Sequence, residues 1–315
     1  MWREFVSRIN FFSDQRNWIT GFCFGASILL AVPFTVFIVS YFTFPLLLLS
    51  AFYSYIVLNV HGTVYLHRYS SHEAFQFRNG FWVFVFKNLV IKIIPEEIFV
   101  VSHYVHHAKP EFPGDPYNVL CGWLYCFLAD VNHQSLATGL SREDYARVCR
   151  MLEHTGVPLN TYEKYQKWGS ASRPLATLLS FLLNWIFWFA ALSLIGGPAL
   201  AFAIFSGAFF WAIAIRNFNF KSHGSGKIKH RDGIEFHRKD LSMNLKLAGF
   251  AAGEWHNNHH LYPRSARSGF LPWQLDFAWI VIHLMNRLKI VTGFQDDIAN
   301  FQKAILVTES TGKAR

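Results

Sequence analysis

The sequence predicts an all-α integral membrane protein, in which four transmembrane helices form two hairpins and a cytoplasmic helical cap holds a histidine-rich metal site. Three observations lead to this fold class. Two long stretches of the 315-residue chain contain no charged side chain, the other segments carry the basic residues that give a net charge of +9, and eight of the fifteen histidines fall into three short clusters. Each uncharged stretch is about twice the roughly 20 residues that one membrane-crossing helix needs.

The N-terminal arm, residues 1–17, precedes the first uncharged stretch and carries three arginines and two acidic residues. The apolar run that follows continues into a second span without a small-residue cleavage site. We therefore expect it to insert as a transmembrane segment and not to be removed as a signal peptide.

The two uncharged stretches cover residues 17–67 and 174–215. We place the first transmembrane hairpin at 18–62, with its turn near 40–45, where a polar Ser-Tyr pair is followed by a proline. The second hairpin is placed at 174–215, with its turn at 196–198, because a Gly-Gly-Pro sequence interrupts a helix.

Both predicted turns are short and uncharged, so the N-terminal arm, the middle segment (63–173) and the C-terminal segment (216–315) should lie on one side of the membrane. The C-terminal segment has fifteen Lys and Arg against eight Asp and Glu, and such an excess marks the cytoplasmic face. We expect one multi-pass membrane domain, residues 1–315, with its active site on the cytoplasmic side of a bacterial inner membrane or the endoplasmic reticulum. Attraction to anionic lipid accounts for the positive charge, so the expected partner is the lipid bilayer and not nucleic acid.

The middle segment contains one apolar stretch, 81–101, that is interrupted by Lys87, Lys92, Glu96 and Glu97. These charges make it unsuitable as a span, and we expect an interfacial or buried helix that ends at His103. Residues 142–173 are polar and contain Gly and Pro, which predicts a cap of short helices and loops.

The histidine clusters are the main functional signal. They comprise His67 and His72; His103, His106 and His107; and His256, His259 and His260, the last two sharing the pattern His-x-x-His-His. On a helix, residues three and four apart lie on one face, so each triplet presents its imidazoles together. Neutral imidazole is the commonest metal ligand, and the clusters therefore predict a metal site.

Two local features refine this prediction. His67 and His72 are five residues apart, so an unbroken α-helix cannot direct both at one metal, and we expect the helix to end or distort there. The third cluster is flanked by Asn257 and Asn258, which can hydrogen-bond around the ligands, and the sequence Leu-Tyr-Pro at 261–263 should end its helix.

Other chemistries fit less well. There is no Gly-x-Ser-x-Gly motif for a hydrolase and no His-Glu-x-x-His motif for a zinc protease. The four cysteines lack regular spacing. The chain also lacks the Glu-x-x-His pairs with which helical bundles hold carboxylate-bridged di-iron centres, which favours a site made mainly of nitrogen ligands.

From about residue 61 to 287, with a patchy stretch at 129–173, the sequence resembles the membrane-bound fatty-acyl desaturases, and most closely their acyl-CoA desaturase branch. The resemblance rests on the three clusters and on the motifs beside them. These motifs are Asp-Pro-Tyr-Asn at 115–118, Tyr-Pro-Arg-Ser-Ala-Arg at 262–267, Trp-Gln-Leu-Asp at 273–276, and Asn219 followed four residues later by His223.

The resemblance implies a di-iron centre, with two iron ions held by nine histidines that are also the catalytic residues. They are the eight cluster histidines His67, His72, His103, His106, His107, His256, His259 and His260, together with His223, while Asn219 holds a metal-bound water. The residues alone would rank His223 no higher than His230 or His237.

The resemblance further implies an oxidoreductase of lipid metabolism and fatty acid biosynthesis, which uses O2 to introduce a double bond into an acyl chain. The chain would be carried as a thioester of CoA or acyl carrier protein, or in a lipid. No flavin or nucleotide motif is present, so two electrons should come from a separate donor of the cytochrome b5, ferredoxin or rubredoxin type. A related fatty-acyl hydroxylase and a non-oxidative membrane metal-binding protein remain alternatives.

Two departures from the family concern the acyl carrier and the third cluster. The tryptophan, arginine and aspartate that precede the second cluster in acyl-CoA desaturases are here Phe99, Val101 and Ser102. In that family the arginine and tryptophan help to bind the CoA thioester, so their loss favours acyl carrier protein, an intact lipid or an unusual acyl thioester as the carrier. The usual Gly-Glu-Gly before the third cluster is Gly-Glu-Trp at 253–255.

Overall fold

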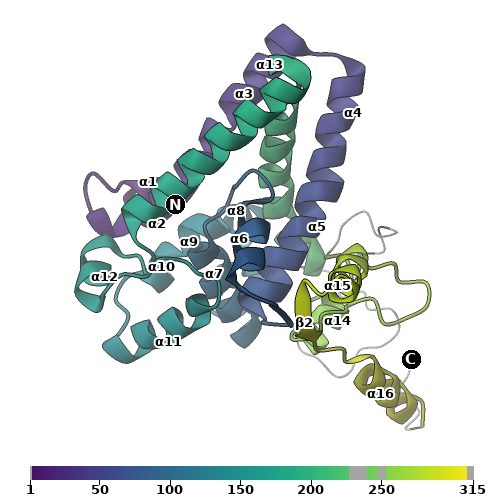
Figure 1. The fold of residues 1–315 in the computed structure, drawn as a ribbon. Helices are drawn as coiled ribbons and strands as arrows, with labels where there is room; N and C mark the ends of the chain where they lie inside the picture. The colour runs from purple at the N-terminus through teal and green to yellow at the C-terminus, as the bar shows by residue number, and fades with distance from the viewer. Residues whose placement is uncertain (1, 227–239, 246, 248–252, 311–315) are drawn as a thin grey trace.

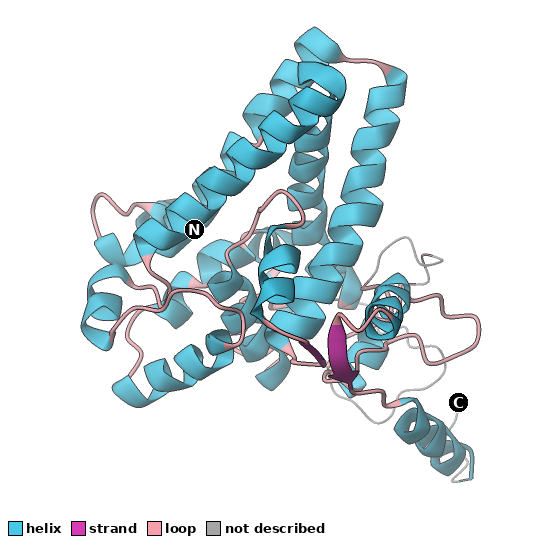
Figure 2. Cartoon of the chain, viewed as in Figure 1, coloured by secondary structure: helices cyan, strands magenta, loops and turns pink. Residues whose placement is uncertain are grey.

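The computed structural model describes residues 2–226, 240–245, 247 and 253–310. The chain is mostly helical, with long helical arms on one side of a body of shorter elements (Figures 1 and 2). The all-α prediction needs one correction, because β1 (Phe75–Phe77) pairs antiparallel with β2 (Val291–Phe294). Phe75 and Phe77 are buried while Gln76 between them is exposed, the alternation of a strand with one covered face.

The first arm follows α1 (Trp2–Ile9) and turns where the sequence predicts. One helical run covers 15–41 and consists of η1 (Gln15–Asn17), α2 (Trp18–Leu29), α3 (Ala31–Val36) and η2 (Phe37–Tyr41). Phe42 and Thr43 are extended, and the Thr43 hydroxyl then caps the next helix by accepting from Leu46 N. The returning run covers 44–71 and consists of α4 (Phe44–Phe52), η3 (Tyr53–Leu58), α5 (Asn59–His61) and η4 (Gly62–Ser71).

The second arm is α13 (Pro174–Ser222), which breaks at the predicted Gly-Gly-Pro sequence. Gly197 has φ +76°, a left-handed conformation that favours glycine. The returning half packs against α4, and a Cβ at Gly207 would lie 2.5 Å from the Ser50 carbonyl oxygen. A residue without a side chain therefore allows the two backbones to approach closely, as in membrane helix pairs.

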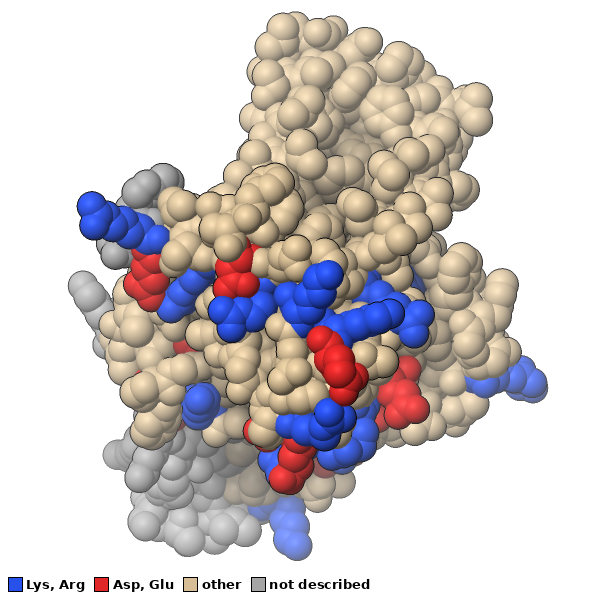
Figure 3. All heavy atoms as spheres, turned by 90° about the vertical axis from the view of Figure 1, so that its left-hand side faces the viewer, with Lys and Arg blue, Asp and Glu red and all other residues tan. Residues whose placement is uncertain are grey.

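Three helical runs are long and apolar enough to cross a membrane among the residues that the structure describes: 15–41, 44–71 and 174–222. Large apolar side chains on these runs are exposed, with Leu194 88% and Val39 78% accessible. On the face drawn in Figure 3, charged side chains are confined to the lower body and the arm above is free of them. The helices continue to Ser71 and Ser222, beyond the hairpin ends predicted at 62 and 215, and so carry polar residues into the body.

The body consists of short helices around the lower ends of the arms. They are α6 (Gly80–Asn88), α7 (Glu96–Ala108), η5 (Val119–Cys121), α8 (Trp123–Phe127), α9 (Ala129–Asn132), α10 (Gln134–Ala137), α11 (Arg142–Glu153), α12 (Tyr162–Trp168), η6 (Gly224–Gly226), α14 (His256–Leu261), α15 (Phe277–Arg287) and α16 (Ile298–Ser310). The helices α11 and α12 confirm the short helices and loops predicted for 142–173.

The single helix predicted over 81–101 is wrong: α6 and α7 are separate, and α7 continues past His103 to Ala108. The intervening residues Val90, Ile91 and Ile93 are buried against α13. The Lys92 backbone N–H donates to the Asn184 side chain. These contacts replace the hydrogen bonds that a continuous helix would have made.

A buried carboxylate anchors α7 to the cap. Glu97 accepts hydrogen bonds from the backbone N–H groups of Ala171 (2.6 Å) and Ser172 (2.9 Å) and from the Ser170 hydroxyl (2.7 Å). Several donors compensate for the burial of a carboxylate. This contact fixes the start of the helix that carries the second histidine cluster.

Candidate metal centre

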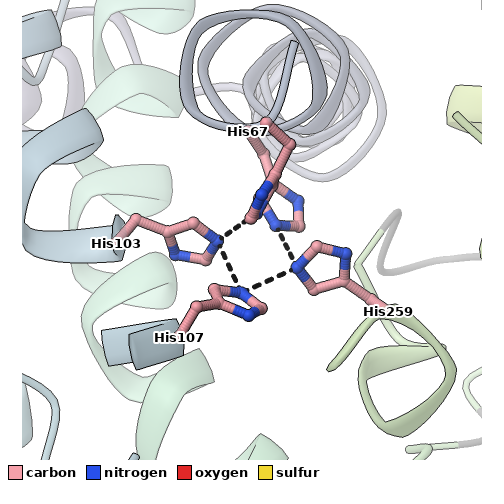
Figure 4. A group of neighbouring side chains, drawn as sticks. His67, His103, His107 and His259 are labelled. Carbon is pink, nitrogen blue, oxygen red and sulfur yellow. Dashed lines mark hydrogen bonds between the residues drawn. The ribbon is translucent and has the colours of Figure 1, made fainter. Parts of the chain in front are cut away.

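Five of the predicted ligands converge on one point between three helices. His67 and His72 come from the end of η4, His103 and His107 from α7, and His259 from α14, and their ligand atoms all lie within 4.8 Å of one another. Figure 4 shows His67, His103, His107 and His259 with their rings directed at a common centre. We call this set the five-histidine group.

The helix that carries His67 and His72 is distorted, as predicted. η4 is a π-helix, whose backbone hydrogen bonds join residues five apart and whose wider turn brings such residues closer to one face than an α-helix does. The helix ends at Ser71 with His72 as its C-cap residue, and the rings of His67 and His72 are 5.1 Å apart, centroid to centroid. The π-helix therefore allows a five-residue spacing to present two ligands to one site.

The remaining predicted ligands form a second set, the four-histidine group. It consists of His106 from α7, His223 at the end of α13, and His256 and His260 from α14. All four are buried. The structure thus brings together all nine predicted histidines, in two groups that share the helices α7 and α14.

The contacts within each group involve the same atom of every ring. In the five-histidine group, Nε2 atoms of successive histidines are 2.9–3.0 Å apart in the order 67, 259, 107, 103, 72. In the four-histidine group they are 2.9–3.1 Å apart in the order 106, 223, 256, 260. A ring nitrogen either donates or accepts, so hydrogen bonding alone would require single N–H groups to serve two neighbours. A cation at each centre would accept all these lone pairs, and the donor set therefore fits a metal.

Burial keeps the imidazoles neutral. It lowers the pKa of His72 to about 3 and lowers the pKa values of His103, His107, His259 and His260 well below the usual range, with neighbouring positive charge adding to the effect. A neutral imidazole has the free lone pair that a metal requires.

These shifts predict how stability depends on pH. The free energy of unfolding of the metal-free protein should fall as the pH falls from about 6.5 toward 3. In this range the unfolded chain binds protons at its histidines, whereas His72 and its neighbours stay unprotonated in the folded protein. Bound metal should move this loss to lower pH, since a coordinated nitrogen takes no proton. Thermal unfolding midpoints at pH 7.5 and 5.5, with and without iron, test this; a metal-free midpoint that stays constant would contradict it.

Two carboxylates lie behind the four-histidine group. Both oxygens of Asp115 are 3.1 Å from His106 Nδ1, and Glu111 accepts from His223 Nδ1. A carboxylate on Nδ1 fixes the hydrogen there and leaves Nε2 free for a metal. Asp115 stands in a motif that the sequence analysis singled out, whereas the role of Glu111 was missed, because only the fold places it beside a histidine 112 residues away in the chain.

The two asparagines of the third cluster brace α14 from outside. Asn258 Nδ2 donates to the Ser268 carbonyl (2.8 Å) and to the Gln274 side chain (2.9 Å), and Asn257 N donates to the Asn244 side chain (3.1 Å). They position the helix that carries the ligands and bond to other segments. α14 ends at Leu261, as predicted from the Leu-Tyr-Pro sequence.

The other histidines bond elsewhere. His61 contacts the Phe86 carbonyl, His133 the Ser102 hydroxyl and His154 the Tyr69 carbonyl. His230 and His237 lie outside the described residues. Within the part of the chain that the structure describes, the cluster histidines and His223 alone form groups suited to a metal.

A cavity touches both histidine groups. Its wall contains His67 and His103 of the five-histidine group and His256 of the four-histidine group, together with Phe99, Trp211 and Asn219. Asn219, which was predicted to hold a metal-bound water, therefore lines the same cavity as these three histidines. An adjoining cavity shares Trp211, Ile215 and Phe218 with it and extends along the second half of α13.

The chain thus combines helical arms long and apolar enough to cross a membrane with two histidine groups that could each hold a metal ion. No family model matches the chain. The curated proteins that it resembles are acyl-CoA and acyl-lipid desaturases.

Two of these relatives align along most of the chain. The sn-2 palmitoyl-lipid 9-desaturase of Nostoc sp. (strain 36) is 26% identical over 88% of this chain and 90% of its own length. The acyl-CoA C20 Delta5-desaturase of Anemone leveillei is 25% identical over 76% of this chain and 71% of its own length. The Delta-9 desaturase-like 4 protein of Arabidopsis thaliana is 48% identical, but the match covers 17% of this chain and only 19% of that protein.

Proposed function

We propose that this protein is an O2-dependent fatty-acyl desaturase with a di-iron centre held by the nine histidines. The observation that carries the proposal is the cavity whose wall includes ligands of both groups. Its apolar wall suits an alkyl chain, and the adjoining cavity along α13 gives the rest of that chain a place to lie. The relatives, which are acyl-CoA and acyl-lipid desaturases, support the same conclusion.

The residues of the chain have distinct roles in this proposal. Bound iron would supply the activation of O2, so that one O2, two electrons and two protons remove two hydrogens from the acyl chain and yield two waters. Phe99 and Trp211 would hold the alkyl chain beside the centre and exclude water from it. Asn219, on the same cavity, would hold a water, while Asp115 and Glu111 hold His106 and His223 in the orientation that leaves Nε2 free.

The surroundings of the second cluster bear on the acyl carrier. Val101, at the position of the CoA-binding arginine of the family, is buried against Tyr145 and Val148. The chain therefore has an apolar contact where a CoA substrate would meet a cation, which favours a lipid or acyl carrier protein. The alignment with an acyl-lipid desaturase over most of the chain supports a lipid as the carrier of the acyl chain.

The membrane arrangement is part of the proposal. The break at Gly196 and Gly197 divides α13 into two halves, each long enough to span a bilayer, so that the three apolar runs would make four spans in two hairpins. The body with its basic residues would face the cytoplasm. There a separate donor of the cytochrome b5, ferredoxin or rubredoxin type would supply the electrons.

Product analysis tests the function directly. We expect that iron-loaded protein, expressed with a matched electron donor, introduces new double bonds into cellular fatty acids, as mass spectrometry of total lipids would show. Supplying the acyl chain as CoA thioester, as acyl carrier protein thioester or in lipid separates the carriers. Hydroxy acids would instead indicate a fatty-acyl hydroxylase. Unchanged lipids under O2 would contradict both activities and indicate a non-oxidative metal-binding protein.

A further inference from the structure

Charge is distributed unequally around the two histidine groups. Glu111 and Asp115 both bond to the four-histidine group. Among the described residues no carboxylate bonds to the five-histidine group, whose printed contacts are between histidines. The arginine that follows His67 in the chain, Arg68, is itself paired with the buried carboxylate of Asp276 at 2.9 Å. Two carboxylates are thus bonded to ligands of the four-histidine group, and none to ligands of the five-histidine group.

The loop that carries the two carboxylates is held in an unusual conformation. Glu111 has φ +62°, which is uncommon for a residue with a side chain. Asp115 accepts from the backbone N–H of Glu111 and of Tyr117, both at 2.9 Å, and Asn118 Nδ2 donates to the Glu111 carbonyl at 3.1 Å. The Leu241 backbone N–H donates to the Glu111 carboxylate itself, at 3.3 Å. Several hydrogen bonds therefore impose a strained backbone whose effect is to direct Glu111 at His223, and such strain is typical of functional sites.

We infer that Glu111 and Asp115 make the two iron sites electronically inequivalent, so that the iron of the five-histidine group is the first to be reduced. This inference rests on the proposed function. Reduction at each site is the gain of one electron by Fe3+ to give Fe2+, with the electron taken from the external one-electron donor. An imidazole that donates to a carboxylate is a more basic ligand and stabilises the higher charge, and among the described residues the five-histidine group has no such carboxylate. Glu111 is a positioning residue, since it acts through His223.

A redox titration of the ⁵⁷Fe-loaded full-length protein, followed by Mössbauer spectroscopy, tests this inference. We expect two ferric signals of equal area, one of which is converted to a ferrous signal at a higher potential than the other. In Glu111→Gln, which keeps a hydrogen-bond acceptor but loses the charge, the later conversion should move to higher potential and the earlier one should stay in place. Glu111→Asp should restore much of the separation, and Glu143→Gln on the exposed face of α11 should change neither.

The outcomes separate this inference from the proposed function. Wild-type protein whose two sites are reduced together at one potential would overturn the inference, whether or not the variants fold, as would equal shifts of both signals in Glu111→Gln. Two separated signals in a protein that forms no double bond would support the inference and count against the desaturase. A protein that binds no iron would overturn both.

Discussion

His106→Ala should abolish product formation and lower bound iron from two ions per chain to about one, because the variant removes a ligand from one site only. His106 is buried, its Nε2 is 3.1 Å from that of His223, and its Nδ1 is held by Asp115. The measurements are iron content by elemental analysis and double bonds by mass spectrometry. The matching variant His259→Ala should remove the iron of the five-histidine group and again abolish the product.

The control must be a histidine that holds no ligand helix in place. His154 is unsuitable, since it exchanges hydrogen bonds with Tyr69 in the helix of the first cluster. His283 on α15 contacts Trp279 and belongs to neither group, so His283→Ala should retain full iron and activity. A His106→Ala protein that kept both would show that the four-histidine group is not a metal site.

How much the sequence could predict depended on the range of the interactions. The eight cluster histidines were recognisable because helical spacing alone places His103, His106 and His107 on one side of α7. The distortion at His67 and His72 followed from their spacing, although the π-helix that produces it could not be named. His223 required the family resemblance, since no local pattern separates it from His230 and His237.

Contacts between distant segments could not be predicted. Nothing near Glu111 in the sequence indicates that it lies beside His223. The pairing of β1 with β2 likewise joins two segments that are far apart in the sequence. The continuous helix expected over 81–101 failed for a related reason. Burial of residues 90–93 against α13 outweighs the local apolar pattern, as tertiary contacts often outweigh helix propensity.

Arg68→Ala should be the most destabilising of the single substitutions outside the ligands. Arg68 and Asp276 form an ion pair whose side chains are 1% and 2% exposed, with Nη2 2.9 Å from a carboxylate oxygen. Asp276 also accepts from the backbone N–H of Ser268 at 2.7 Å and of Trp279 at 2.9 Å. Removing one partner leaves an uncompensated buried charge, so the free energy of unfolding should fall by about 3–5 kcal/mol. Denaturant unfolding in detergent measures this change.

The same pair joins two ligand-bearing segments, because Arg68 follows His67 and Asp276 closes the loop that braces α14 through Ser268. Arg68→Ala should therefore release iron even under conditions in which the chain stays folded, which a purely global destabilisation would not cause. Arg142→Ala, which breaks an exposed pair with Glu163, should change neither stability nor iron content measurably. The double variant Arg68→Met with Asp276→Leu removes both charges and should recover part of the stability but not the iron. Wild-type iron content in Arg68→Ala would show instead that η4 and α14 hold their histidines in place without this link.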